Sequence, residues 1–159
     1  QDKGDKLFRR SMYTYWKRSS PAPSLTIFDA PTREKCALRR SRTNTPLQAL
    51  VTLNDVQFVE ASRALAERAL KQGGNTLDSQ IDHAYRLASG TRPKSFVREI
   101  LKQAYHDELK LFQADKERAT KLISAGESPR DETLDPAVHA AMSIVTSMIL
   151  NLDEVLTRG

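Results

Sequence analysis

The stretch "RRSRTNTPLQALVTLND", residues 39–55, changes from basic and polar to apolar in its middle. Thr45, Pro46 and Gln48 match a capping box with proline at the first helical position, where its missing N–H leaves no donor unpaired. The apolar residues that follow predict a helix as far as about Leu53, and Asn54-Asp55 then interrupt it. The stretch therefore predicts an α-helix with a sharp start, a sharp stop and a basic lead-in.

Similar start and stop signals recur along the rest of the chain. A second helix is expected from Asn54-Asp55 to Gly73-Gly74, and its predicted inward face holds Phe58, Ala61, Leu65 and Ala69. A third is expected from residue 75 or 76 to Gly90, with a stripe of Leu77, Ile81, Ala84, Tyr85 and Ala88. Later helices are expected at about 94–113, 116–124 and 136–150, the last of them continuing to Leu156 in the longer reading. In the helix at 94–113, the residues predicted to face inward are Val97, Ile100, Leu101, Ala104 and Leu111.

These signals predict an all-α fold. Five or six helices follow residue 45 and are expected to pack as a bundle or an orthogonal array, because short loops join antiparallel neighbours. Residues 46–159 form the predicted helical domain. Residues 1–45 form an irregular, basic, proline-containing segment of the same domain. The first residue is Gln1 rather than Met, so we expect the chain to be part of a longer protein.

The basic character of the chain is concentrated in its first quarter. Residues 1–42 contain eleven Lys/Arg and four Asp/Glu, whereas residues 43–159 contain fourteen and sixteen. Residues 7–18 combine aromatic and cationic side chains; their spacing favours a helix, although alternation allows a strand. Residues 19–45 are expected to be irregular, with Leu25, Ile27 and Phe28 docking onto a hydrophobic core.

Few features of the chain point to catalysis. The single cysteine, Cys36, excludes an internal disulfide, and no CxxCH haem-attachment motif occurs. His83, His106 and His139 lie on different predicted helices without metal-ligand spacing. No nucleotide-binding loop or nucleophile elbow is present. No apolar run reaches the roughly 18 residues that a membrane-spanning helix needs. The chain alone is therefore expected to be non-catalytic and to bind no cofactor or metal.

A polar cluster around the lead-in is the candidate binding surface. The arginines are not needed to start the helix, so we expect them to meet acidic groups of another region or of a partner. Aromatic residues interleaved with cations are also typical of single-stranded nucleic-acid binding, although no recognised motif accompanies them. The candidate interface residues are Trp16, Asp29, Arg33, Arg39, Arg40, Arg42 and Asn44.

Long motifs of the chain resemble one protein family. The segments "RRSMYTYWKRSSPAPSLTIFDAP", "RRSRTNTPLQALVTLNDVQF", "AYRLASGTRP" and "LDPAVHAAMSIVTSMILNLDEVLTR" are similar to a planctomycete and verrucomicrobial domain of unknown function, in which "TYWKR", "FDAP" and "TNTPLQAL" have close counterparts. Thr91 departs from the family's usual arginine. The resemblance covers essentially the whole chain and implies no catalytic residues, because no activity is established for the domain.

The resemblance also implies a context. Family members are exported proteins in which a planctomycete-type cytochrome c domain often precedes this one, so a haem c would be attached elsewhere in the parent protein. The leading hypothesis is a non-catalytic scaffold or docking module with a link to electron transfer, whose partners are upstream domains of the parent or another chain. The second is part of a polysaccharide-related enzyme whose basic cluster binds an anionic sugar. The third is nucleic-acid binding, which is the least favoured.

Overall fold

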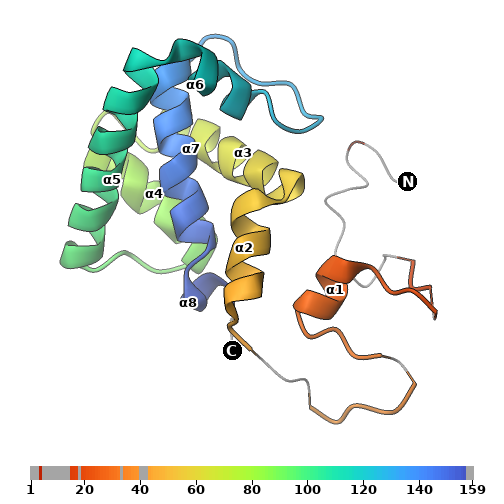
Figure 1. The fold of residues 1–159 in the computed structure, drawn as a ribbon. Helices are drawn as coiled ribbons and strands as arrows, with labels where there is room; N and C mark the ends of the chain where they lie inside the picture. Colours follow the sequence, from red (N-terminus) through yellow and green to blue (C-terminus); the bar gives the residue numbers. More distant parts are fainter. Residues whose placement is uncertain (1–3, 5–14, 18, 33, 40–42, 157–159) are drawn as a thin grey trace.

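The computed structural model describes residues 4, 15–17, 19–32, 34–39 and 43–156. Over these ranges it contains eight helices and no strand, which confirms the predicted all-α class (Figure 1). The longer helices are α2 (Pro46–Asn54), α3 (Val56–Gln72), α4 (Leu77–Ser89), α5 (Ser95–Ala114), α6 (Lys116–Ile123) and α7 (Pro136–Leu150). The two short helices are α1 (Pro23–Ile27) and α8 (Asp153–Leu156).

The helices begin where local capping chemistry predicts. Thr45 Oγ1 accepts a hydrogen bond from Gln48 N at 3.3 Å, and Gln48 Oε1 accepts one from Thr45 N at 2.9 Å, so the predicted capping box of α2 is present. Asp55 ends α2 and caps α3 by accepting from Gln57 N at 2.9 Å. Asp135 caps α7, whose first residue is a proline, as the sequence predicts. These short-range bonds place the helix boundaries within about two residues of the predicted ones.

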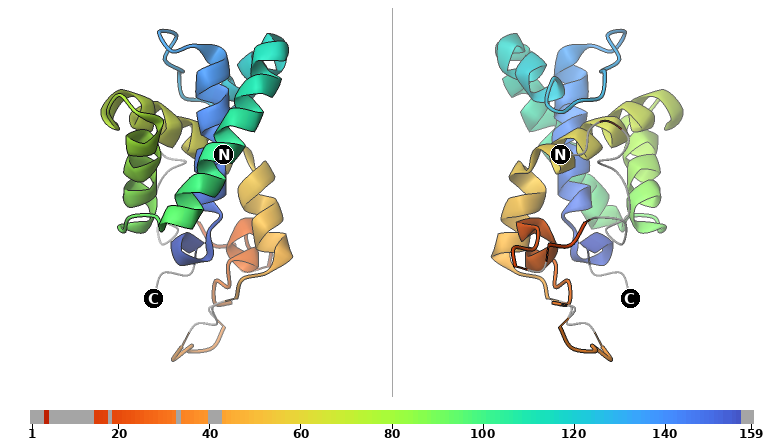
Figure 2. Two further views of the ribbon diagram at one scale, coloured as in Figure 1. Left: turned by 90° about the vertical axis from the view of Figure 1, so that its left-hand side faces the viewer. Right: turned by 90° about the vertical axis from the view of Figure 1, so that its right-hand side faces the viewer.

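Helix α7 forms the centre of the domain. It packs against α3, α5 and α6, and also contacts α4 (Figures 1 and 2). Its alanines, Ala137, Ala140 and Ala141, are buried and allow these neighbours to approach closely. The helix ends at Leu150, and α8 is a separate helix rather than a continuation of α7.

The inward face of α5 differs from the predicted one. Ile100 and Leu111 are exposed, whereas Tyr105 and Phe112 are buried together with Leu101. Burying two large aromatic rings removes more apolar surface from water than burying Ile and Leu does. The predicted stripe was therefore wrong by a small rotation about the helix axis, and the rotation leaves Ile100 facing solvent.

The N-terminal segment lies against α2 and α3. Helix α1 interrupts the irregular stretch predicted for residues 19–45 and contacts α2 (Figures 1 and 2). Leu25, Ile27 and Phe28 are half-buried, and the Phe28 ring lies 6.0 Å from that of Phe58. These residues therefore dock onto the helical domain of this chain. Residues 15–17 are not helical, and most of the helix predicted at 7–18 lies outside the described residues.

Candidate docking surface

Helix α2 faces the domain with its polar side. Gln48 and Thr52 are only 2% and 3% exposed, and they are the buried residues of this helix. In contrast, Leu47, Leu50, Leu53 and the adjoining Val56 are between 46% and 58% exposed. A helix on the surface of a folded domain normally does the opposite and buries its apolar stripe. We call these four aliphatic residues the α2 face. It is an exposed apolar surface on a helix whose polar side is buried.

Gln48 holds α2 in this orientation. Its Nε2 donates to Ile27 O at 2.9 Å and to Thr43 Oγ1 at 3.1 Å, while its Oε1 accepts from Thr45 N. Each end of the buried amide is therefore satisfied, as a buried polar group requires. Because the two Nε2 bonds join α2 to Ile27 after α1 and to Thr43 in the lead-in, rotating the helix to bury its leucines would break both of them.

Two further contacts tie α2 and its lead-in to the C-terminal end of the domain. Thr52 Oγ1 donates to Asn151 Oδ1 at 2.6 Å, at the end of α7. Asn44 Nδ2 donates to Asp153 Oδ1 at 2.9 Å, at the start of α8. The polar side of α2 is thus used for attachment to the domain, and its apolar side is left outward.

Asp29 fixes the turn that follows α1. Its backbone has a φ of 57°, in the left-handed region that Asp tolerates better than most residues. Its carboxylate accepts from Thr43 Oγ1 at 2.7 Å and Thr43 N at 2.9 Å. These hydrogen bonds lower the pKa of Asp29 below its ordinary value. The carboxylate is therefore occupied in closing the segment between residues 29 and 43.

The candidate interface residues do not all belong to one cluster. Asp29 and Asn44 lie on either side of Thr43, and both make structural hydrogen bonds. Arg39 is exposed, and no bond joins it to either of them in the described part of the chain. Trp16 is half-buried. Arg33, Arg40 and Arg42 lie outside the described residues. Asp29 and Asn44 therefore hold the lead-in in place, and the role of the arginines stays a prediction.

A second cluster, not predicted from the sequence, lies buried between α3 and the loop after α6. Glu60 accepts hydrogen bonds from Ser128 N at 2.7 Å and Glu127 N at 3.1 Å, and also from the Ser128 hydroxyl. Arg63 Nη2 donates to Ser128 O at 2.9 Å and lies 3.8 Å from Glu60 Oε1. The loop is therefore bound to α3 through one buried carboxylate and one buried guanidinium.

The loop conformation and the ionisation of Glu60 depend on each other. Burial raises the pKa of Glu60, but the hydrogen bonds from Ser128 and Glu127 and the charge of Arg63 together lower it by more. The pKa therefore lies below its ordinary value, and the carboxylate stays charged. Gly126 has a φ of 99°, and a methyl group there would overlap the Glu60 carboxylate.

His139 belongs to the same polar interface, on the facing side of α7. Its Nε2 lies 3.2 Å from Arg63 O, and since a carbonyl oxygen only accepts, the ring proton is on Nε2. Burial lowers the pKa of His139 below its ordinary value, so the ring is neutral near pH 7. On the next turns Thr146 Oγ1 donates to Ser62 O at 2.8 Å. The α3–α7 contact is therefore partly polar, although α3 was predicted to bury Phe58, Ala61, Leu65 and Ala69, of which only Ala69 is fully buried.

Neither cluster has the composition of a metal site. Among the described residues, no group of three or more His, Cys, Asp or Glu side chains could hold a metal ion. Cys36 is exposed. No helix in the described ranges is both long and apolar enough to cross a membrane.

Fold and surface together define an all-α domain with a basic N-terminal segment and an outward-facing apolar helix. The chain belongs to the family described as PSD1, a protein of unknown function (DUF1553), whose model matches residues 1–105. The matched range covers about two thirds of the chain, includes the whole α2 face and ends within α5. Searches of curated proteins and of solved structures found no match.

Proposed function

We propose that the chain is a docking module that binds another region of a larger parent protein through the α2 face. The observation that carries the proposal is the inverted orientation of α2, with Gln48 and Thr52 buried and its leucines outward. Exposed contiguous apolar surface of this kind marks interaction sites in soluble domains. The orientation is held by the two hydrogen bonds that Gln48 Nε2 donates to Ile27 O and Thr43 Oγ1, so the face is presented ready for binding.

The chemistry of the surface indicates what it binds. Helix α2 contains no charged residue, and the 42 residues that precede Thr43 carry a net charge of +7 from eleven Lys/Arg and four Asp/Glu. A complementary surface would be an aliphatic strip with acidic side chains beside it. We assign the complementary surface to another domain of the same polypeptide, which the connecting chain would keep close to the α2 face.

The wider setting of the proposal rests on the sequence resemblance. We place the module in an exported, cytochrome-associated protein, where docking would hold domains in a fixed arrangement for electron transfer. Any haem c would be attached elsewhere in the parent, because this chain has one cysteine and no CxxCH motif.

Photo-crosslinking in the organism that makes the protein tests the proposal. A photoreactive residue replaces Leu53 on the α2 face, and in a control it replaces Lys110, which is exposed on α5. We expect Leu53 alone to crosslink to an aliphatic, acid-flanked segment of the parent protein, and Leu47→Ser/Leu50→Ser to remove that adduct. Both leucines are exposed, so this double variant should fold normally. Equal adducts at the two sites, or an adduct with a second copy of the chain, would refute the proposal.

A further inference from the structure

A second exposed surface lies where α4 passes into α5. Residues 86–100 read "RLASGTRPKSFVREI" and contain four Lys/Arg and one Glu. The connector lies at the end of the bundle where α8 also lies (Figures 1 and 2). This surface is separate from the α2 face, and its role is independent of the function proposed for that face.

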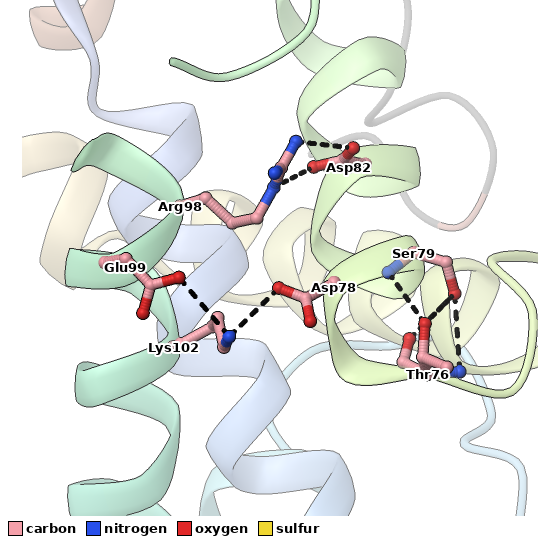
Figure 3. A network of polar contacts seen from close by, with 7 residues as sticks. All are labelled: Thr76, Asp78, Ser79, Asp82, Arg98, Glu99 and Lys102. Carbon is pink, nitrogen blue, oxygen red and sulfur yellow. Dashed lines mark hydrogen bonds and ion pairs between the residues drawn. The ribbon is translucent and has the colours of Figure 1, made fainter. Parts of the chain in front are cut away.

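Two of the charges in this stretch are used within the domain. Arg98 donates from Nε and Nη2 to the carboxylate of Asp82 at 2.7 and 2.9 Å. Glu99 and Asp78 lie 3.3 and 3.1 Å from Lys102 Nζ (Figure 3). These contacts join α4 to α5 and neutralise the only acidic side chain of residues 86–100.

The remaining three cations lie outside these contacts. Arg86, Arg92 and Lys94 are exposed, and within the described ranges none of them forms an ion pair. Lys94 is the N-cap of α5 and makes no side-chain capping bond. The free N–H groups of that first turn add to the positive potential. The connector is therefore a local site for an anionic surface.

Exposed apolar side chains lie directly beside these cations. Phe96 and Ile100 are 62% and 56% exposed and lie one turn apart at the start of α5. Leu87, on the last turn of α4, is also exposed. The buried face of α5 is formed by Leu101, Tyr105 and Phe112, so Phe96 and Ile100 are not part of the core. The connector and the helix ends that it joins thus carry both exposed cations and exposed apolar groups.

We infer that this surface binds an anionic phospholipid membrane from one side. Arg86, Arg92 and Lys94 would contact the phosphate groups, while Phe96 and Ile100 enter the boundary between headgroups and acyl chains. Apolar side chains next to unpaired Lys and Arg are typical of such interfacial binding. A purely acidic polymer would neutralise the cations but leave both apolar side chains in water, whereas an anionic membrane supplies phosphate groups and acyl chains side by side.

Vesicle co-sedimentation of the whole chain tests this inference. The probes are vesicles of phosphatidylcholine alone and of equimolar phosphatidylglycerol and phosphatidylcholine. We expect binding only to the anionic vesicles. Since one Lys or Arg near such a surface changes the partition about fivefold, Arg92→Gln/Lys94→Gln should lower it about 25-fold. The control Lys116→Gln/Lys121→Gln removes the same charge from exposed positions of α6 and should bind nearly as well as the wild type.

The apolar contribution is measured separately. Phe96→Ser/Ile100→Ser keeps every charge and should weaken vesicle binding, most clearly at high salt, where electrostatic attraction is screened. The inference is overturned if the wild type ignores anionic vesicles, or if the two charge variants lose the same affinity. It is also overturned if Phe96→Ser/Ile100→Ser binds like the wild type and soluble polyglutamate competes fully, because the surface would then recognise acidic polymers.

Discussion

Replacing Glu60 by alanine should destabilise the domain far more than removing the partly exposed charge of Glu67 on the same helix. Glu60 receives three hydrogen bonds from Glu127 and Ser128, and its oxygen lies 3.8 Å from Arg63 Nη2. The substitution leaves the guanidinium of Arg63, whose side chain is 3% exposed, without its carboxylate. The loop between α6 and α7 also loses the three hydrogen bonds that Glu60 accepts, while Arg63 and Lys71 still join it to α3.

The size of the effect follows from this burial. Removing one partner of a buried ion pair costs about 3–5 kcal/mol, because the remaining charge is uncompensated. The freed N–H groups of Glu127 and Ser128 belong to exposed residues and can bond to water, so they add little. For a chain of this length each kcal/mol lowers Tm by about 2–4 °C, which gives a decrease of about 6–20 °C.

Urea denaturation followed by circular dichroism measures the change. Glu67→Ala is the matched control, since Glu67 lies on the same helix but pairs with the partly exposed Lys71 at 2.8 Å. An exposed pair of this kind contributes little, so the control should change the urea midpoint only slightly. If Glu60→Ala shifts the midpoint no more than Glu67→Ala does, the buried carboxylate does not hold the loop and the reasoning fails.

Three further predictions concern the same polar contacts. Because the buried His139 has a lowered pKa, the unfolded chain takes up a proton below about pH 6.5 that the folded chain does not. The free energy of unfolding should therefore fall as the pH decreases from 7.5 towards 5.5, and less steeply in His139→Gln; equal slopes in urea titrations would contradict this. Gly126→Ala should cost about 1–3 kcal/mol by strain at positive φ, and more if the Glu60 carboxylate cannot move aside; a wild-type Tm would show that the loop adapts freely. Asp29→Ala should speed tryptic cleavage after Lys35 and Arg39 without changing the helical signal, because the segment is no longer closed onto residue 43; unchanged cleavage rates would argue against that closure.

Local signals in the sequence were sufficient for the boundaries of the longer helices, α2 to α7, but not for the short helices α1 and α8. The caps at Thr45, Asp55 and Asp135 join atoms no more than three residues apart, so their residue types alone identify them. The same holds for Gly90, whose φ of 79° ends α4 at the predicted residue. Boundaries of this kind depend on contacts between residues that are close in sequence, so the local sequence is enough to identify them.

The buried polar clusters could not be predicted in the same way. Glu60 and Arg63 are three residues apart on α3, and such a pair normally indicates an exposed face. Their main partners are Ser128 and Glu127, which are more than sixty residues away in sequence. The sequence signal for this cluster lies in the segment "AGESPRD", and it was not recognised. There Gly126 is followed by the N–H groups of Glu127 and Ser128, which together bind a carboxylate.

The α2 face was missed for a related reason, and its size bears on the kind of partner it needs. An apolar helix pattern shows that leucines will be buried somewhere, but the buried Gln48 shows that this domain does not bury them.

Full burial of one aliphatic side chain contributes about 1.5–3 kcal/mol, so four half-exposed ones contribute on the order of 3–6 kcal/mol. Free association of two proteins costs an estimated 4–15 kcal/mol or more in lost motion and ordering. The α2 face alone is therefore too small to hold a separate chain firmly. A partner on the same polypeptide avoids most of that cost, because the connecting chain keeps its effective concentration high. The balance favours docking between domains of one protein over binding of a free protein.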